Sequence, residues 1–387
     1  MRYSVFDGLR GTFLLLMMYN HAASVLPSHI GTLINHHQLG FADAAHGFVF
    51  LSGLVIALYF MRVLRERGEE ALAPLVRRRI IFIYKYHIGA LLGLAILANL
   101  FPQAAGRLDV FRQMGPDEYL ALVLLINQPS FFDILPMYMV FIAGTPLVLR
   151  MFERGQAWSV LAASIGLWLI AQTGVISVLV ESIEREIDTT GLDIRLGSFG
   201  IFSWQLIYLA GLMFGYFTFS GRFNVNFVRS LPASFPKIAV AAFMGIFLFQ
   251  QFIFHHPASF DQVINSLNAV HSKWNFSLFF VASVAVYAII TTWLYVAGPH
   301  SSNPMIVLIS KNFQVVLNSR PLTLLGQNSI QVFTYHLILI YLLSALADLH
   351  PMSGAARFVI LILSTLSLFG FAMVWRWTRI RYPVASS

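Results

Sequence analysis

The sequence predicts an all-α fold, a polytopic bundle of transmembrane helices that crosses a bilayer about ten times. Hydrophobic residues make up 58% of the 387 residues and charged residues only 11%, and the mean hydropathy is +0.72. The apolar residues gather in stretches of about 20, the length that spans the hydrocarbon core of a membrane as a helix. Long alternating strands, which a β-barrel needs, are absent from the sequence.

Ten stretches are expected to span the membrane, and together they form one integral-membrane domain, 1–387, without internal repeats or an added soluble domain. In chain order they are 9–28, 42–64, 79–101, 133–152, 157–180, 202–219, 237–254, 274–297, 323–347 and 355–377. The apolar segment 120–127 is too short to span. The segment 305–317 is interrupted by Lys311 and Asn312, so we expect it at the membrane interface.

The basic residues predict the orientation of these spans. With the N-terminus in the cytoplasm, 19 of the 25 lysines and arginines fall on the cytoplasmic side, as the positive-inside rule requires. Acidic residues concentrate on the opposite side. Both termini are therefore expected in the cytoplasm. The net charge of +8 sums a basic inner and an acidic outer face, so no nucleic-acid partner is expected.

Arg10 and His21 are the most informative pair in the chain. They lie eleven residues apart in the first apolar stretch, so an α-helix places both on one face, ~16 Å apart along its axis. Asp7 extends the same stripe. Ionisable side chains at this depth are functional candidates. His21 has the pKa range of a general base, or is a buried histidine bonded to another helix. Arg10 is a ligand for phosphate or for a polarised carbonyl, or a snorkelling anchor.

A second basic cluster opens the third predicted span. Arg77, Arg78 and Arg79 precede Lys85 and His87, which follow about one and two turns inside the span. The cluster is either a topology determinant in contact with anionic lipid or part of a site for an anionic ligand.

Three further residues are candidates by position. Asp133 precedes Pro136 at the start of a span, so it is a helix N-cap or an acid that orients the His21 imidazole. His336 is expected at the depth of His21, and His46 lies near the outer end of its span. The chain has no cysteine, and adjacent histidines do not share a helix face, so no metal site or bound cofactor is expected.

The motifs resemble those of the acyltransferase-three family of integral-membrane acyl transferases. The similarity runs from residue 6 to about 340 and includes 6–11 (FDGLRG), Arg10 followed by His21, 47–53 (GFVFLSG), 326–329 (GQNS) and 335–336 (YH). More narrowly, the chain is similar to the glucan-succinylating, OpgC-type branch in 84–87 (YKYH), 133–138 (DILPMY), 204–205 (WQ) and 331–333 (QVF). That branch more often carries an acidic residue at the position of His46, so the resemblance leaves its role open.

The resemblance implies transfer of a succinyl group from cytoplasmic succinyl-CoA to glucose hydroxyls of an osmoregulated periplasmic glucan. It also implies that the protein lies in the bacterial inner (cytoplasmic) membrane, with membrane lipid around it. Residues and resemblance together give a candidate catalytic set of His21, Asp133 and His336. The candidate substrate-binding set is Arg10, Asp7, Arg79, Lys85, His87, His46 and Ser52. Two alternatives stay open: the same chemistry with another acyl group or a different polysaccharide or lipid acceptor, and a proton-coupled glucan or lipid transporter.

Overall fold

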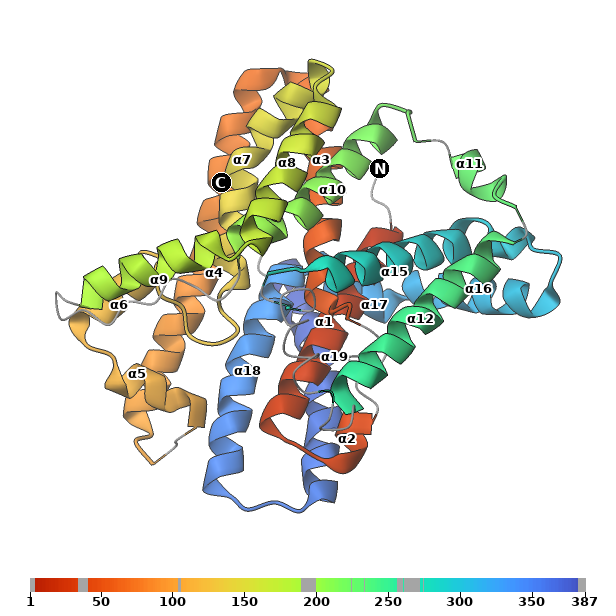
Figure 1. Cartoon of the computed structure of the whole chain (residues 1–387). Helices are drawn as coiled ribbons and strands as arrows, with labels where there is room; N and C mark the ends of the chain where they lie inside the picture. The colour runs from red at the N-terminus through yellow and green to blue at the C-terminus, as the bar shows by residue number, and fades with distance from the viewer. Residues whose placement is uncertain are drawn as a thin grey trace. The chain divides into compact units, whose positions relative to one another are not determined.

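The computed structural model describes residues 4–33, 41–103, 106–188, 200–223, 225–232, 234–255, 260, 272–273 and 275–381. Within these ranges the chain is helical and contains no strand, which confirms the predicted all-α class (Figure 1). The longer helices are α1 Ser4–Val25, α3 Ala44–Arg67, α4 Leu72–Leu100, α7 Ile134–Glu153, α8 Ala157–Gln172, α9 Val175–Asp188, α10 Ile201–Phe219, α12 Phe235–His255, α15 Leu278–Val296, α16 Pro304–Leu317, α18 Ser329–Leu349 and α19 Gly354–Arg381. The shorter ones are α2 His29–Leu33, α5 Asp109–Gln113, α6 Pro116–Val123, α11 Val225–Arg229 and α17 Arg320–Gln327.

In the described part of the chain, eight helices are long and apolar enough to cross a membrane, or nine if the bent pair α8 and α9 counts as one span. The chain is therefore a multi-pass membrane protein. Helix α1 is not among the eight, because Arg10, Asn20 and His21 lower its hydropathy. The count of ten spans and their orientation stay predictions.

One predicted span is bent in the structure. The stretch 157–180 was expected as one span, and it forms two helices, α8 and α9, that meet at a bend of 62°. Gly174 sits in the break with φ +78, a conformation that glycine adopts at little cost. The apolar segment 120–127 overlaps α6, which ends at Val123, whereas 305–317 forms the short apolar helix α16.

The chain divides into two compact units, each described by itself. Unit 1 consists of Met1–Asn35, Ile83–Gly115 and Gln314–Ser387, and unit 2 of His36–Phe82 and Pro116–Phe313. Helix α4 contributes to both. The prediction of a single integral-membrane domain is not tested by this division and stays a prediction.

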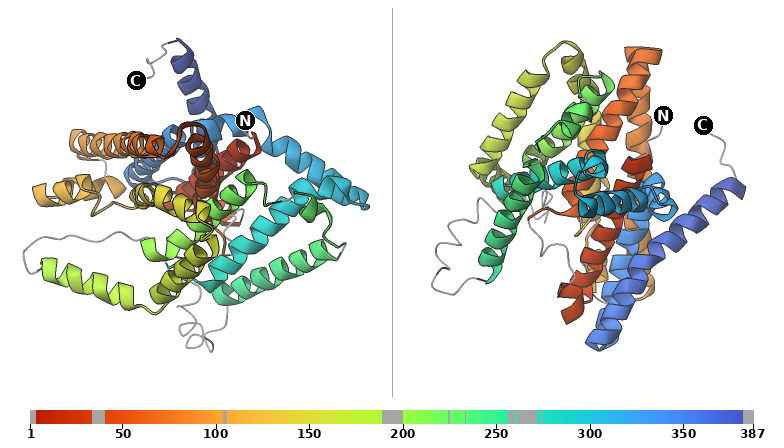
Figure 2. Two further views of the ribbon diagram at one scale, coloured as in Figure 1. Left: turned by 90° about the horizontal axis from the view of Figure 1, so that it is seen from above. Right: turned by 90° about the vertical axis from the view of Figure 1, so that its right-hand side faces the viewer.

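Glycines let α1 approach α17 in unit 1. A Cβ added to Gly11 would collide with the backbone oxygen of Leu322, and one added to Gly326 with the backbone oxygen of Asp7. Small residues bring helices this close in membrane proteins, where packing replaces the hydrophobic effect as the driving force. Helices α18 and α19 form a hairpin beside them (Figure 1, Figure 2).

Unit 2 is built around the same device between α3 and α10. A Cβ at Gly53 would meet the backbone of Tyr208, and one at Gly211 the backbone of Phe50. Helices α7 and α8 pack against this pair, and α12 lies along α15 (Figure 2). Trp204 of α10 and Phe60 of α3 are among the largest fully buried side chains.

Candidate functional site: a histidine pair between α1 and α18

His21 and His336 face each other in unit 1. Nδ1 of His21 lies 2.7 Å from Nε2 of His336, a hydrogen bond between two ring nitrogens. The rings stack, with centroids 4.9 Å apart and an angle of 24° between their planes. His336 is fully buried, whereas His21 is partly exposed. The structure thus brings together two of the three residues in the predicted catalytic set.

The pair needs α1 and α18 to lie side by side, and the glycine contacts provide this. Asp7 is 5% exposed, and its backbone lies against Gly326. Gly326 comes two residues before Asn328, the N-cap of α18. The crossing of α1 with α17 therefore fixes the distance between the two histidine-bearing helices. Arg10 follows one turn after Asp7 and is partly buried.

Polar contacts hold α18 to α4 and α19 near His336. The Gln331 amide donates to the Tyr86 hydroxyl at 3.3 Å, and the Tyr86 ring meets Trp375 edge-on. On the other side, the Tyr335 hydroxyl donates to Ser367 at 3.1 Å. Tyr86 and Gln331 come from two of the sequence stretches that resemble OpgC-type proteins, and in the structure these stretches touch.

The pair Lys85 and His87 does not form one surface. His87 is 0% exposed, whereas Lys85 is exposed. Two residues along a helix turn the side chain by about 200°, so the two side chains point to opposite sides. Of these two predicted ligands for an anion, only Lys85 is accessible on the surface of α4.

His46 of unit 2 has a structural role that its sequence position did not reveal. It forms a capping box at the start of α3: the Ala45 N–H donates to the Asp43 side chain at 3.3 Å, and the Asp43 N–H donates to His46 Nδ1 at 3.1 Å. The ring is fully buried and stacks on Trp204 at 4.5 Å. The sequence did contain a signal for this capping box, because Asp43 lies three residues before a side chain that can accept a hydrogen bond.

Asp43 also forms an ion pair with Lys273. Neither residue was in the predicted sets. Lys273 is far from Asp43 in the sequence, and the folded chain brings it to the start of α3. The fully buried Trp204 belongs to a motif of the resemblance, and its ring stacks on His46 beside Asp43.

Asp133 occupies the N-cap position of α7, as one of the two interpretations predicted, but its side chain makes no capping hydrogen bond. It is 7% exposed and has helical backbone angles. Asp133 belongs to unit 2 and His21 to unit 1. The proposed orientation of the imidazole by Asp133 stays a prediction.

The remaining candidates lie on helices of unit 2. Ser52 is 1% exposed and lies next to Gly53, at the contact of α3 with α10. Arg79 is partly buried, with its guanidinium 5.8 Å from the centre of the Phe82 ring. Among the described residues, no group of three or more His, Asp or Glu side chains is placed to hold a metal ion.

Apolar helices and a histidine pair between α1 and α18 define the class: a multi-pass integral-membrane protein with titratable groups on its helices. A sequence model of the OpgC protein family matches residues 2–380, so the chain belongs to this family. At the level of the family it is a glucan-related acyltransferase. No curated protein and no solved structure matches the chain.

Proposed function

We propose that this protein transfers a succinyl group from succinyl-CoA to glucose hydroxyls of a periplasmic glucan, with His21 as the general base. The observation that carries the proposal is the hydrogen-bonded pair of His21 and His336 inside a member of a glucan-related acyltransferase family. An acyl transfer to a hydroxyl needs a group that accepts the hydroxyl proton, and a partly exposed, oriented histidine meets that need.

The proposed role of His21 requires one particular tautomer of the pair. If His21 donates from Nδ1–H to Nε2 of His336, then Nε2 of His21 carries the lone pair that can accept a proton. His336, with its remaining proton on Nδ1, holds the His21 ring in that orientation. It then stays bonded to the imidazolium that forms. Full burial of His336 means that His21 is the member of the pair that a substrate can reach.

The proposed chemical step is an acyl transfer in which His21 takes up one proton and returns it. His21 Nε2 takes the proton of a glucose hydroxyl, and the hydroxyl oxygen attacks the carbonyl carbon of the thioester. The carbon–sulfur bond then breaks, and the CoA thiolate takes the proton from His21. The base contributes about 10²- to 10⁴-fold to the rate, and the alignment of donor and acceptor contributes the rest.

Arg10 is proposed to bind a CoA phosphate. Its guanidinium suits bidentate binding of phosphate, and it lies on the α1 stripe ~16 Å from His21. Arg79 and Lys85 are proposed as further ligands for the donor, while Asp7 acts through the position of α1. For His87, His46 and Ser52 full burial favours support of the site over direct contact with substrate.

The experiment compares periplasmic glucans from a strain that lacks the gene and carries wild type, His21→Ala or His300→Ala. His300 is an exposed histidine on another element and serves as the control. We expect succinylated glucans with wild type and His300→Ala and unmodified glucans with His21→Ala. Protein amounts in the membrane are measured in parallel.

Unmodified glucans with wild type would contradict the assigned acceptor. Release of CoA from a panel of acyl-CoA compounds by the purified protein then decides between another acyl transfer and a transporter, since a transporter leaves its substrate chemically unchanged. A reporter fused to the C-terminus, active only in the cytoplasm, tests the proposed inner-membrane orientation.

A further inference from the structure

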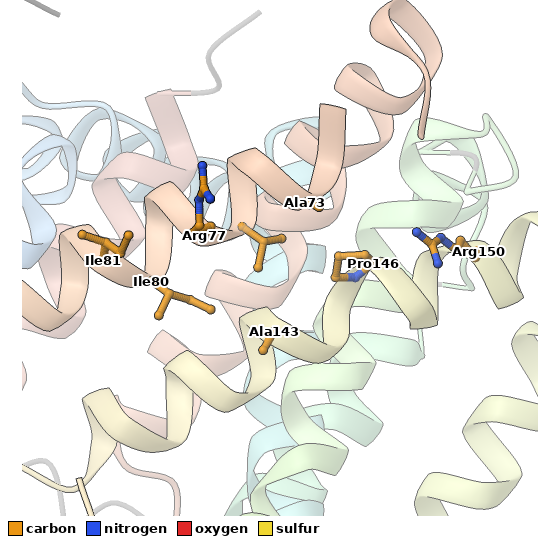
Figure 3. Close-up of a pocket in the computed structure, with 8 residues that line it drawn as sticks. Ala73, Arg77, Ile80, Ile81, Ala143, Pro146 and Arg150 are labelled. Carbon is orange, nitrogen blue, oxygen red and sulfur yellow. The ribbon is translucent and has the colours of Figure 1, made fainter. Parts of the chain in front are cut away.

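Helix α9 of unit 2 has an exposed apolar side. Some apolar side chains of this unit line the hollow between α4 and α7, as Ile80 and Ala143 do (Figure 3). On α9, by contrast, Val178 is 58% exposed, Leu179 55% and Ile183 51%. Adjoining exposed apolar side chains mark a surface that binds a partner.

The two sides of α9 differ in polarity, because apolar and polar residues alternate with the period of an α-helix. One side is apolar over about two turns and consists of Val175, Ile176, Leu179 and Ile183. The opposite side is polar and consists of Ser177, Glu181 and Glu184. Glu186 lies on the apolar side and ends the stripe near the end of the helix. A helix with this pattern lies between water and an apolar phase.

Helix α8, which precedes α9, has a different composition. Its residues 157–172 include no charged side chain. The uncharged stretch continues in the sequence to Val180, but the next six residues, 181–186, include four charged ones. A charged side chain is costly in the hydrocarbon core of a bilayer. The second half of α9 therefore fits the membrane surface and does not fit a continuation of the span.

The bend between the two helices turns α9 toward the membrane plane. The angle of 62° is about two thirds of a right angle, and the usual tilt of a membrane span, about 20°, supplies most of the rest. Figure 1 shows α9 running sideways from the end of α8. The stretch 157–174 has 18 residues, within the range of about 17 to 25 that crosses a bilayer. The part of the chain before α9 is thus long enough for the span.

We propose that α9 lies in the interface of the bilayer, with its apolar side in the acyl chains of the membrane lipids and its acidic side in water. The membrane is the partner that the structure favours, because only Thr173 and Gly174 separate α9 from the uncharged helix α8. Basic residues, which draw other interfacial helices to anionic lipid, are replaced on the polar side by glutamates. Binding therefore depends on burial of the apolar side and needs no anionic lipid. This inference is independent of the proposed acyl transfer.

The absence of cysteine from the chain allows a direct test, because a single introduced cysteine is the only site for a spin label. The full-length protein is labelled at Leu179→Cys on the apolar side or Glu184→Cys on the polar side and placed in phosphatidylcholine vesicles. Electron paramagnetic resonance measures access of oxygen, which concentrates in the bilayer, and of a neutral nickel complex, which stays in water. We expect the Leu179→Cys label about 5–10 Å into the boundary of headgroups and acyl chains, and the Glu184→Cys label in water.

Two further labels test the orientation of the helix. Ile176 and Ile183 are seven residues apart, so they lie on one side of α9 and ~10 Å apart along its axis. A helix in the membrane plane gives labels at Ile176→Cys and Ile183→Cys the same depth. Depths that differ by ~10 Å would overturn the proposal, because α9 would then continue the span. A label at Ile165→Cys, in the middle of α8 and 40% exposed, is the reference and should lie deeper than both.

A charge added to each side of α9 completes the test. Ile183→Glu should move the Leu179→Cys label toward water, whereas Ser177→Glu adds the same group to the polar side and should leave the label in place. Both positions are exposed, so neither change disturbs a packed core. Equal access of the nickel complex to both sides would place α9 in water. An immobilised Leu179→Cys label with low access to both reagents would place another protein segment, or a second copy of the chain, on the apolar side. Either result would overturn the proposal.

Discussion

The α1–α17–α18 region of unit 1 and the α3–α10 region of unit 2 use the same packing device for different purposes. In both, glycines bring helix backbones into contact: Gly11 and Gly326 in the first region, Gly53 and Gly211 in the second. Each region also holds a fully buried histidine, His336 and His46 respectively. The difference lies in what surrounds the ring. His336 meets another imidazole, whereas His46 meets a backbone N–H and an indole ring.

The role of a buried histidine therefore depends on the groups that its ring nitrogens contact. An imidazole nitrogen can donate or accept a hydrogen bond, depending on where its proton is, so the bond between His21 and His336 leaves two positions open for the shared proton. A backbone N–H can only donate, so it fixes His46 as an acceptor at Nδ1 and ties the ring to the start of α3. The first arrangement suits catalysis, and the second suits stability.

The largest effect is expected from the glycine contacts themselves. Gly326→Val would force α17 away from the Asp7 backbone, and Gly211→Val would do the same between α10 and α3, so both should abolish accumulation of folded protein. Gly89→Val is the matched control, because a Cβ there meets nothing within 4 Å. Size-exclusion profiles of the detergent-solubilised variants measure the outcome. A normal profile for Gly326→Val would contradict the close contact of α1 with α17.

His21→Ala should lower the rate of acyl transfer by about 10²- to 10⁴-fold, the typical contribution of a general base. The measurement is CoA release from succinyl-CoA in the presence of a glucan acceptor. Thermal stability should change much less, because His21 is partly exposed. Transfer at the wild-type rate would remove His21 from the mechanism and leave the pair as a packing feature.

His336→Ala should have a smaller effect on the rate, about 10- to 100-fold, the usual range for a residue that orients a functional ligand. Because His336 acts through His21, the loss is expected in kcat with little change in KM for succinyl-CoA. His336→Asn offers a carbonyl that can accept the His21 Nδ1–H, so it should restore part of the rate. An equal loss for Ala and Asn would argue against orientation by hydrogen bonding.

His46→Ala should cost about 1 kcal/mol of stability, the usual value of a helix cap, with additional loss from the missing ring on Trp204. The rate of acyl transfer per folded molecule should stay near that of wild type. Thermal unfolding together with CoA release measures both quantities. A large fall in kcat with unchanged stability would move His46 from support of α3 to the chemistry.

Several features could be predicted from the sequence because they depend on local pattern. The length of the apolar stretches predicts membrane helices, and the structure describes helices over most of them. Helical periodicity places Arg10 and His21 on one side of α1, since both belong to a single continuous helix. The break in 157–180 was missed, because a glycine within an apolar stretch does not by itself show whether the helix continues.

The class of the protein, the stripe of polar residues on α1 and the basic run near the start of α4 can all be predicted from the amino-acid sequence alone. These follow from composition and from the 3.6-residue repeat, which act over a few turns. Three features depend on the folded chain: His21 meets His336, 315 residues away; His46 caps α3; and His87 is buried while Lys85 is exposed. Such contacts depend on how closely two helices approach, and that distance is set by glycines on helices far apart in the chain.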